Sequence, residues 1–60
     1  STTIVRARRY AVRAMTLEEA AQEVGPSTDA FVVFRNLGTD AISVLYRRKD
    51  GDFGLIEPQA

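Results

Sequence analysis

The chain is short and lacks the residues that commonly reinforce short chains. It has 60 residues with no cysteine and no histidine, so disulfides and metal sites built on thiolate or imidazole ligands are excluded. A domain of this length buries only about 60% of the surface that its unfolded chain exposes, and it is marginally stable by itself. Without such reinforcement it depends on close packing or on a partner subunit. The sequence therefore favours one domain that associates with another chain.

The clearest local pattern is a helix within residues 15–25. Thr16 is a typical N-cap, and Glu19 lies three residues later, which is the spacing of a capping box. One narrow apolar stripe follows at helical spacing: Leu17, Ala20, Ala21 and Val24. Gly25 and Pro26 end the pattern. Because a helix of this length is not stable alone in water, we expect it to pack against a sheet.

Four stretches rich in β-branched and aromatic residues predict strands over residues 3–12, 30–36, 41–48 and 53–57. With the helix they give the order β-α-β-β-β of a small α+β domain, in which the last three strands form an antiparallel meander. Arginines interrupt the first stretch, which suits an edge strand or a subunit boundary. We expect one antiparallel sheet with the helix on one of its faces.

The turns predict which residues lie side by side in the meander. Asp50 and Gly51 form a strong signal for a two-residue hairpin turn, since type I′ turns need positive φ at both central positions. That turn predicts these neighbours across the last hairpin: Lys49 with Asp52, Arg48 with Phe53, Tyr46 with Leu55, and Val44 with Glu57. An even-length turn around residues 38–39 predicts Phe31 beside Tyr46, although this register is less constrained.

Both faces of the predicted sheet are apolar, and the chain offers only one helix to cover them. The larger face is predicted to hold Phe31, Val33, Ile42, Val44, Tyr46, Phe53 and Leu55. The smaller face holds Val32, Phe34, Leu45 and Ile56. The short apolar stripe of the helix suits the smaller face, which leaves the larger one exposed as an interface. We expect a twofold homodimer that buries it; the alternative is that the first strand or a further domain covers this face.

The charged residues offer a second prediction, in which the chain contacts RNA. Eight lysines and arginines balance eight acidic residues, whereas a domain that binds nucleic acid by itself usually has a basic excess. The basic residues nevertheless cluster, and those that could make such a contact are Arg6, Arg8, Arg9, Arg47, Arg48 and Lys49. No apolar run is long enough to span a membrane. The absence of cysteine and of a signal-peptide pattern predicts a cytoplasmic protein.

No combination of residues predicts catalysis. The chain lacks histidine, and its serines and threonines have no base to activate them. The stretch "DGDFG" shares letters with a magnesium motif of kinases but lacks the accompanying motifs. Asp50 and Asp52 supply too few oxygen ligands for calcium. We expect a protein that is not an enzyme, with no cofactor, no metal and no small-molecule substrate.

Three stretches resemble the C-terminal domain of long-form ribosome hibernation-promoting factors: "IVRARRYAVRAMTLEEA", "FVVFRN" and "ISVLYRRKDGDFGLIEP". The resemblance covers nearly the whole chain and is most specific over residues 46–58. Residues 21–30 depart from the family, whose helix is usually longer and is followed by a Gly-His-Asp lead into the next strand. Here Gly25 and Pro26 interrupt the helix.

The resemblance implies a role in pairing inactive ribosomes. In this family an N-terminal domain, which lies outside this chain, binds the small ribosomal subunit, and the C-terminal domain dimerises so that two silent ribosomes are held together. Residues 1–60 would be that dimerisation domain, with the first strand exchanged between subunits. The family's interface maps to Phe31, Val33, Val44 and Tyr46. The alternative is a small domain that binds the ribosome or RNA through the arginine clusters named above.

Overall fold

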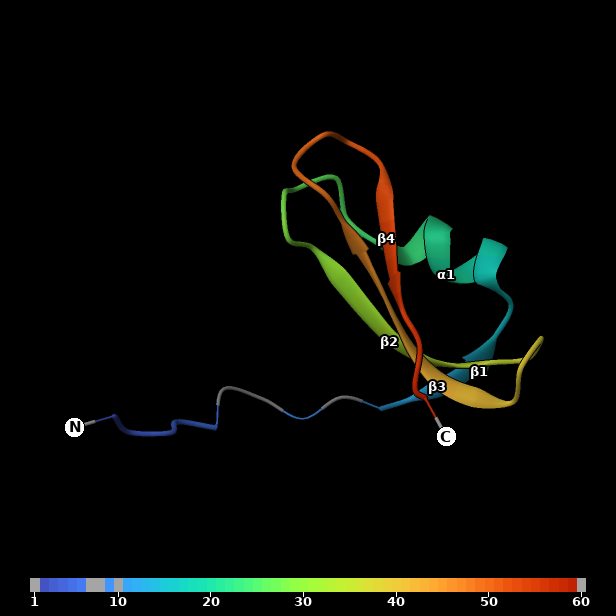
Figure 1. Cartoon of the computed structure of the whole chain (residues 1–60), viewed down its shortest axis with the longest axis horizontal. Coiled ribbons are helices and arrows are strands. Elements are labelled where there is room, and N and C mark those ends of the chain that lie inside the picture. Colours follow the sequence, from blue (N-terminus) through green and yellow to red (C-terminus); the bar gives the residue numbers. More distant parts are fainter. Residues whose placement is uncertain (1, 7–8, 10, 60) are drawn as a thin grey trace.

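The computed structural model of the chain describes residues 2–6, 9 and 11–59 (Figure 1). One helix and one four-stranded sheet follow each other in the predicted order, with bounds β1 Arg13–Met15, α1 Leu17–Glu23, β2 Phe31–Asn36, β3 Ala41–Arg47 and β4 Phe53–Ile56. The spatial order of the strands is β1-β2-β3-β4. The predicted small α+β domain with a β-α-β-β-β order is therefore confirmed.

The first strand lies later in the chain than predicted, and it makes the sheet mixed. β1 pairs with β2 in parallel through Arg13–Met15, whereas the described parts of residues 3–12 belong to no strand. The rest of that predicted strand, residues 7, 8 and 10, falls outside the described residues. The helix carries the chain back to the end of the sheet at which β1 begins, which makes the pairing parallel. Ile4 and Val5 are 94% and 79% exposed, and Figure 1 shows this segment running away from the domain.

The helix begins as the sequence predicts. The Glu19 backbone N–H donates to Thr16 Oγ1 at 3.1 Å, and the Thr16 N–H donates to Glu19 Oε1 at 2.8 Å, which together form the capping box. Val24 caps the other end with extended backbone dihedrals, just before Gly25. Because α1 has only seven residues, its stability comes from packing on the sheet.

A small core lies between the helix and one face of the sheet. Its members are the buried side chains of Met15, Ala20, Val24, Phe34 and Leu45. Phe34 is fully buried at its centre, with Ala21, Ala30 and Val32 packed at its edge. Leu17 is 38% exposed and lies outside this core, so the stripe that α1 buries is narrower than the sequence suggests.

The register of the first hairpin is confirmed, and that of the second differs from the prediction by one residue. Phe31 pairs with Tyr46 across β2 and β3, as expected. Across β3 and β4, however, the pairs are Arg47 with Phe53, Tyr46 with Gly54, Leu45 with Leu55 and Val44 with Ile56. The predicted pairs Tyr46–Leu55 and Val44–Glu57 are therefore wrong.

The cause of this shift is the conformation of the turn at Asp50. Gly51 has φ of 91°, but Asp50 is not among the residues with positive φ, so the two-residue type I′ turn does not form. The Gly51 N–H donates to the Arg48 carbonyl at 3.1 Å, and the Arg48 N–H donates to the Asp52 carbonyl at 2.7 Å. The Asp50 side chain accepts the Asp52 N–H at 3.0 Å, which holds a turn one residue longer than predicted.

The one-residue shift exchanges the two faces of β4. Phe53 and Leu55, which were predicted on the larger apolar face, lie on the helix side of the sheet instead. Ile56, predicted on the helix side, joins the larger face together with Gly54. We call this side the open face, and its apolar members are Phe31, Val33, Ile42, Val44, Tyr46 and Ile56.

Candidate association surface

The open face is an apolar sheet surface that no described element of the chain covers. The only described helix, α1, lies on the other side of the sheet (Figure 1). Phe31 is 45% exposed, Ile42 47% and Ile56 57%, and the other three members are half-buried. A contiguous apolar surface of this kind is typical of a protein–protein contact.

One end of the open face is hollowed. A depression of about 260 Å³ is lined by Asp29, Phe31, Val44, Tyr46 and Ile56. Its floor is apolar, and Asp29 lies at its edge, where the Asp29 N–H donates to the Arg47 carbonyl at 3.1 Å. Beside it the ring of Tyr46 lies across Gly54. A Cβ atom built on Gly54 would come within 2.2 Å of Tyr46 Cζ, so the absence of a side chain there is what leaves room for the ring. A surface with this shape can receive an apolar side chain.

The basic residues of the last hairpin are largely occupied by contacts within the hairpin. The Arg47 guanidinium lies over the Phe53 ring, 4.3 Å from its centroid, and donates to the Gly51 carbonyl at 2.9 Å. Arg48 forms an ion pair with Asp50 at 3.2 Å. The pKa of Asp50 is lowered, first by the hydrogen bond from the Asp52 backbone and then by Arg48. The predicted RNA contact through Arg47, Arg48 and Lys49 stays a prediction.

The other predicted basic cluster lies in the segment before β1. We call residues 2–12 the arm; Arg6 and Arg9 are exposed there, whereas Arg8 falls outside the described residues. By sequence the arm carries three arginines and no acidic residue, a charge of +3, while residues 13–60 carry five basic and eight acidic residues, a charge of −3. The balanced net charge therefore conceals a basic arm attached to an acidic domain.

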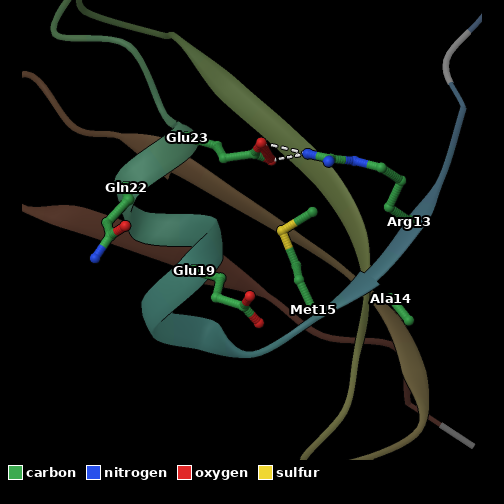
Figure 2. Close-up of a pocket in the computed structure, with 6 residues that line it drawn as sticks. All are labelled: Arg13, Ala14, Met15, Glu19, Gln22 and Glu23. Atoms are coloured by element: carbon green, nitrogen blue, oxygen red, sulfur yellow. Dashed lines mark hydrogen bonds and ion pairs between the residues drawn. The ribbon is translucent and has the colours of Figure 1, made fainter.

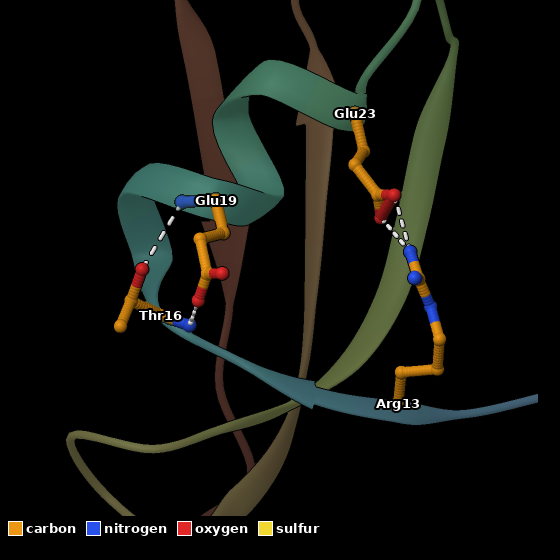
Figure 3. Close-up of polar contacts among 4 residues, drawn as sticks. All are labelled: Arg13, Thr16, Glu19 and Glu23. Atoms are coloured by element: carbon orange, nitrogen blue, oxygen red, sulfur yellow. Dashed lines mark hydrogen bonds and ion pairs between the residues drawn. The ribbon is translucent and has the colours of Figure 1, made fainter.

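A polar cleft of about 250 Å³ separates β1 from the helix (Figure 2). Its lining residues are Arg13, Ala14, Met15, Glu19, Gln22 and Glu23. An ion pair between Arg13 and Glu23 crosses it, and Glu19 is held by the capping box (Figure 3). The pKa of Glu19 is lowered, mainly because its carboxylate accepts the Thr16 backbone N–H.

The described residues contain no group of three or more side chains suited to hold a metal ion. None of the helices in the part of the chain that the structure describes is long and apolar enough to cross a membrane. Within residues 2–6, 9 and 11–59, the features that could take part in recognition are thus the open face, the arm and the polar cleft.

Fold and surface together define a small α+β domain that leaves one apolar face of its sheet uncovered. The sequence matches the family described as "Sigma 54 modulation/S30EA ribosomal protein C terminus" over residues 1–55, so the chain belongs to this family. It is also 43% identical over 58 residues to the ribosome hibernation promotion factor of Bacillus subtilis (strain 168). That alignment covers 97% of this chain and 31% of the relative, so the chain spans about a third of its length. The resemblance drawn from the sequence is confirmed.

Sequence reasoning placed five of its seven interface candidates on one surface and misplaced two. Phe31, Val33, Ile42, Val44 and Tyr46 share the open face, whereas Phe53 and Leu55 do not. It missed Ile56, which only the turn geometry could have revealed. It also missed the pairing of Arg13 with Glu23, since residues ten apart in sequence carry no local signal of contact.

Proposed function

We propose that this chain is the homodimerisation domain of a ribosome hibernation factor and that two copies associate through their open faces. The observation that carries the proposal is the exposed apolar surface of Phe31, Ile42 and Ile56 and their neighbours. A symmetric pairing would cover two such faces with one contact. It would also provide the external reinforcement that a chain of this size requires.

Burial of the open face alone contributes too little free energy for a tight dimer, so a second contact between the subunits is needed. Completing the burial of each side chain contributes about 1 kcal/mol, so six on each of two copies contribute about 12 kcal/mol. Association itself costs about 4–15 kcal/mol. Because the two figures are similar, a dimer held by the face alone would be weak.

The arm is the second contact in this proposal. Its described residues belong to no strand, and Ile4 and Val5 are almost fully exposed. Its charge of +3 is opposite to the −3 of residues 13–60, which favours docking on a second copy. We therefore infer that each subunit donates its arm to its partner, which agrees with the strand exchange implied by the family.

The ribosomal part of the proposal rests on the family and on the Bacillus subtilis relative. That relative is named a ribosome hibernation promotion factor, and the chain matches about a third of it. We propose that the chain works in a longer protein whose N-terminal domain binds the small ribosomal subunit, so that dimerisation pairs two inactive ribosomes in the cytoplasm. In this role the chain supplies binding and no catalysis.

A second candidate function is direct contact with RNA through the arm, which the exposed side chains of Arg6 and Arg9 favour. The hairpin arginines favour it less, because Arg48 is paired with Asp50. Binding of a monomer to RNA, with an affinity that falls steeply as salt rises, would support this function over dimerisation.

Sedimentation equilibrium of the chain at micromolar concentration tests the main proposal. We expect a dimer for the natural sequence and a monomer for Phe31→Ala or Tyr46→Asp, with circular dichroism reporting whether each variant is folded. Leu37→Ala is a matched control, since Leu37 is an exposed apolar residue in the turn between β2 and β3. A monomeric natural sequence, or a folded Tyr46→Asp variant that remains dimeric, would contradict the proposal.

A further inference from the structure

An ion pair joins the first strand to the far end of the helix. Arg13 Nη2 contacts both carboxylate oxygens of Glu23 (Figure 3). The two residues face each other across the polar cleft above Met15 (Figure 2). The side chains are 63% and 40% exposed, so the pair lies at the surface and contributes little to the stability of the fold itself.

The position of Glu23 is unfavourable for the helix taken alone. Glu23 is the last residue of α1, and the last turn contains no basic residue. A carboxylate near the helix C-terminus is repelled by the partial negative charge of the unpaired carbonyl groups there. Within the described structure, Arg13 is the cation that compensates Glu23, so the value of this glutamate lies in its contact with β1.

Arg13 connects the ion pair to the arm. Arg13 is the first residue of β1, and the arm ends immediately before it. The other end of β1 is well anchored, because Met15 is buried in the core and its carbonyl accepts the Leu37 N–H at 3.0 Å. At the arm end, Ala14 is exposed and the side-chain anchor is the pairing of Arg13 with Glu23.

We propose that the Arg13–Glu23 ion pair is a positioning device for dimerisation: it fixes the direction in which the arm leaves the domain. This inference rests on the proposed function, in which the arm docks on a second copy. A segment that is already oriented loses less conformational entropy when it binds. Holding the arm in place at its junction with β1 therefore strengthens the dimer without adding a contact between the subunits. In this inference both residues act through the arm.

The first test compares two variants that remove the same charge from the same helix. Glu23→Gln breaks the ion pair, whereas Glu18→Gln changes an exposed acid of the first turn whose side chain forms no ion pair or hydrogen bond with the described residues. We expect Glu23→Gln to raise the dimer Kd about 2- to 30-fold, since each dimer contains two such pairs. Glu18→Gln should leave the Kd within about 2-fold. The reversed pair, Arg13→Glu with Glu23→Arg, should recover most of the affinity.

The second test asks whether the ion pair acts through the arm. Val5→Ser weakens the arm, and it is combined with Glu23→Gln in a double-mutant cycle of dimer Kd measured by sedimentation equilibrium. If the pair orients the arm, Glu23→Gln should lose most of its effect in the Val5→Ser background. If the pair only stabilises the helix, the two effects would add, and that result would overturn the inference.

The outcomes separate this inference from the proposed function. A natural sequence that is monomeric would overturn both. A dimeric natural sequence for which Glu23→Gln and Glu18→Gln have equal Kd values would overturn the ion-pair inference alone. Thermal unfolding of each variant at a concentration far below the Kd shows that the subunits remain folded.

Discussion

The two faces of the sheet are built from the same strands, yet they are completed differently. On the helix side, α1 covers the centre of the sheet well enough that Phe34 is fully buried, whereas Phe53 and Leu55 of β4 lie beyond the helix and are 41% and 38% exposed. On the open face, side chains of the same kinds remain half-exposed, with Phe31 at 45%. The difference arises because a helix of seven residues covers one side only. One face therefore decides whether the chain folds, and the other offers a surface for association.

Truncating one phenylalanine on each face tests most strongly whether the two faces have different roles. Phe34→Ala should cost about 3–5 kcal/mol because it leaves a cavity at the centre of the core. A chain of this size has about 3–9 kcal/mol of total stability, so the variant should lose a large part of it. Urea titration followed by circular dichroism measures the loss. Phe31→Ala removes the same atoms from the open face and should mainly weaken association; an equal loss of fold for both variants would show that the faces are not distinct.

A smaller and sharper test concerns Gly54. Its Cβ in a Gly54→Ala variant would lie 2.2 Å from Tyr46 Cζ, so the tyrosine ring must move. In an isolated subunit the ring can swing into solvent, and the free energy of unfolding should change by less than about 1 kcal/mol. In a dimer through the open face the displaced ring should raise the Kd about 10- to 100-fold.

Sedimentation equilibrium and urea titration of the same Gly54→Ala sample separate those two effects. Gly51→Ala is an unsuitable control, because Gly51 has φ of 91° and the substitution would strain the turn. Gly25→Ala is a better one, since a Cβ atom on Gly25 would meet Ala30 Cβ at 3.6 Å, an ordinary contact distance, and Gly25 is not among the residues with positive φ. A Gly54→Ala variant that dimerises normally would show that Tyr46 is not at the contact.

Part of the folding stability on the helix side should be sensitive to acid, and this effect should be smaller than those above. The pKa of Glu19 is lowered from 4.5 by its hydrogen bonds to Thr16. A lowered pKa in the folded state means that the stabilisation is present above about pH 4.5 and is lost as the pH falls through the folded-state value. The thermal midpoint should therefore decline below that pH. Glu19→Gln keeps a side chain able to form the capping box but does not titrate, so its decline should be shallower; equal slopes would contradict this assignment.

The sequence allowed accurate prediction where the governing interactions were local. The capping box depends on two residues three apart, and the register of β2 with β3 depends on a short turn. The register of β4 could not be predicted, because it depends on whether Asp50 adopts positive φ or uses its side chain to accept the Asp52 N–H. That choice decided the face of Phe53, Leu55 and Ile56.

β1 and its ion pair were out of reach for a different reason. Three residues in parallel pairing leave almost no periodic signal, and the arginine-rich stretch before them looked more like a strand. The contact between Arg13 and Glu23 requires the helix to return across the cleft, which depends on the tertiary structure.

The placement of Tyr46 over Gly54 also has a spectroscopic consequence. The chain contains no tryptophan and two tyrosines, Tyr10 and Tyr46. In a Tyr10→Phe background, Tyr46 would be the single ultraviolet fluorophore, and its ring lies on the open face. Its emission intensity, which depends on quenching by neighbouring groups, then reports the surroundings of that one ring, so association through the open face can be followed in unlabelled protein.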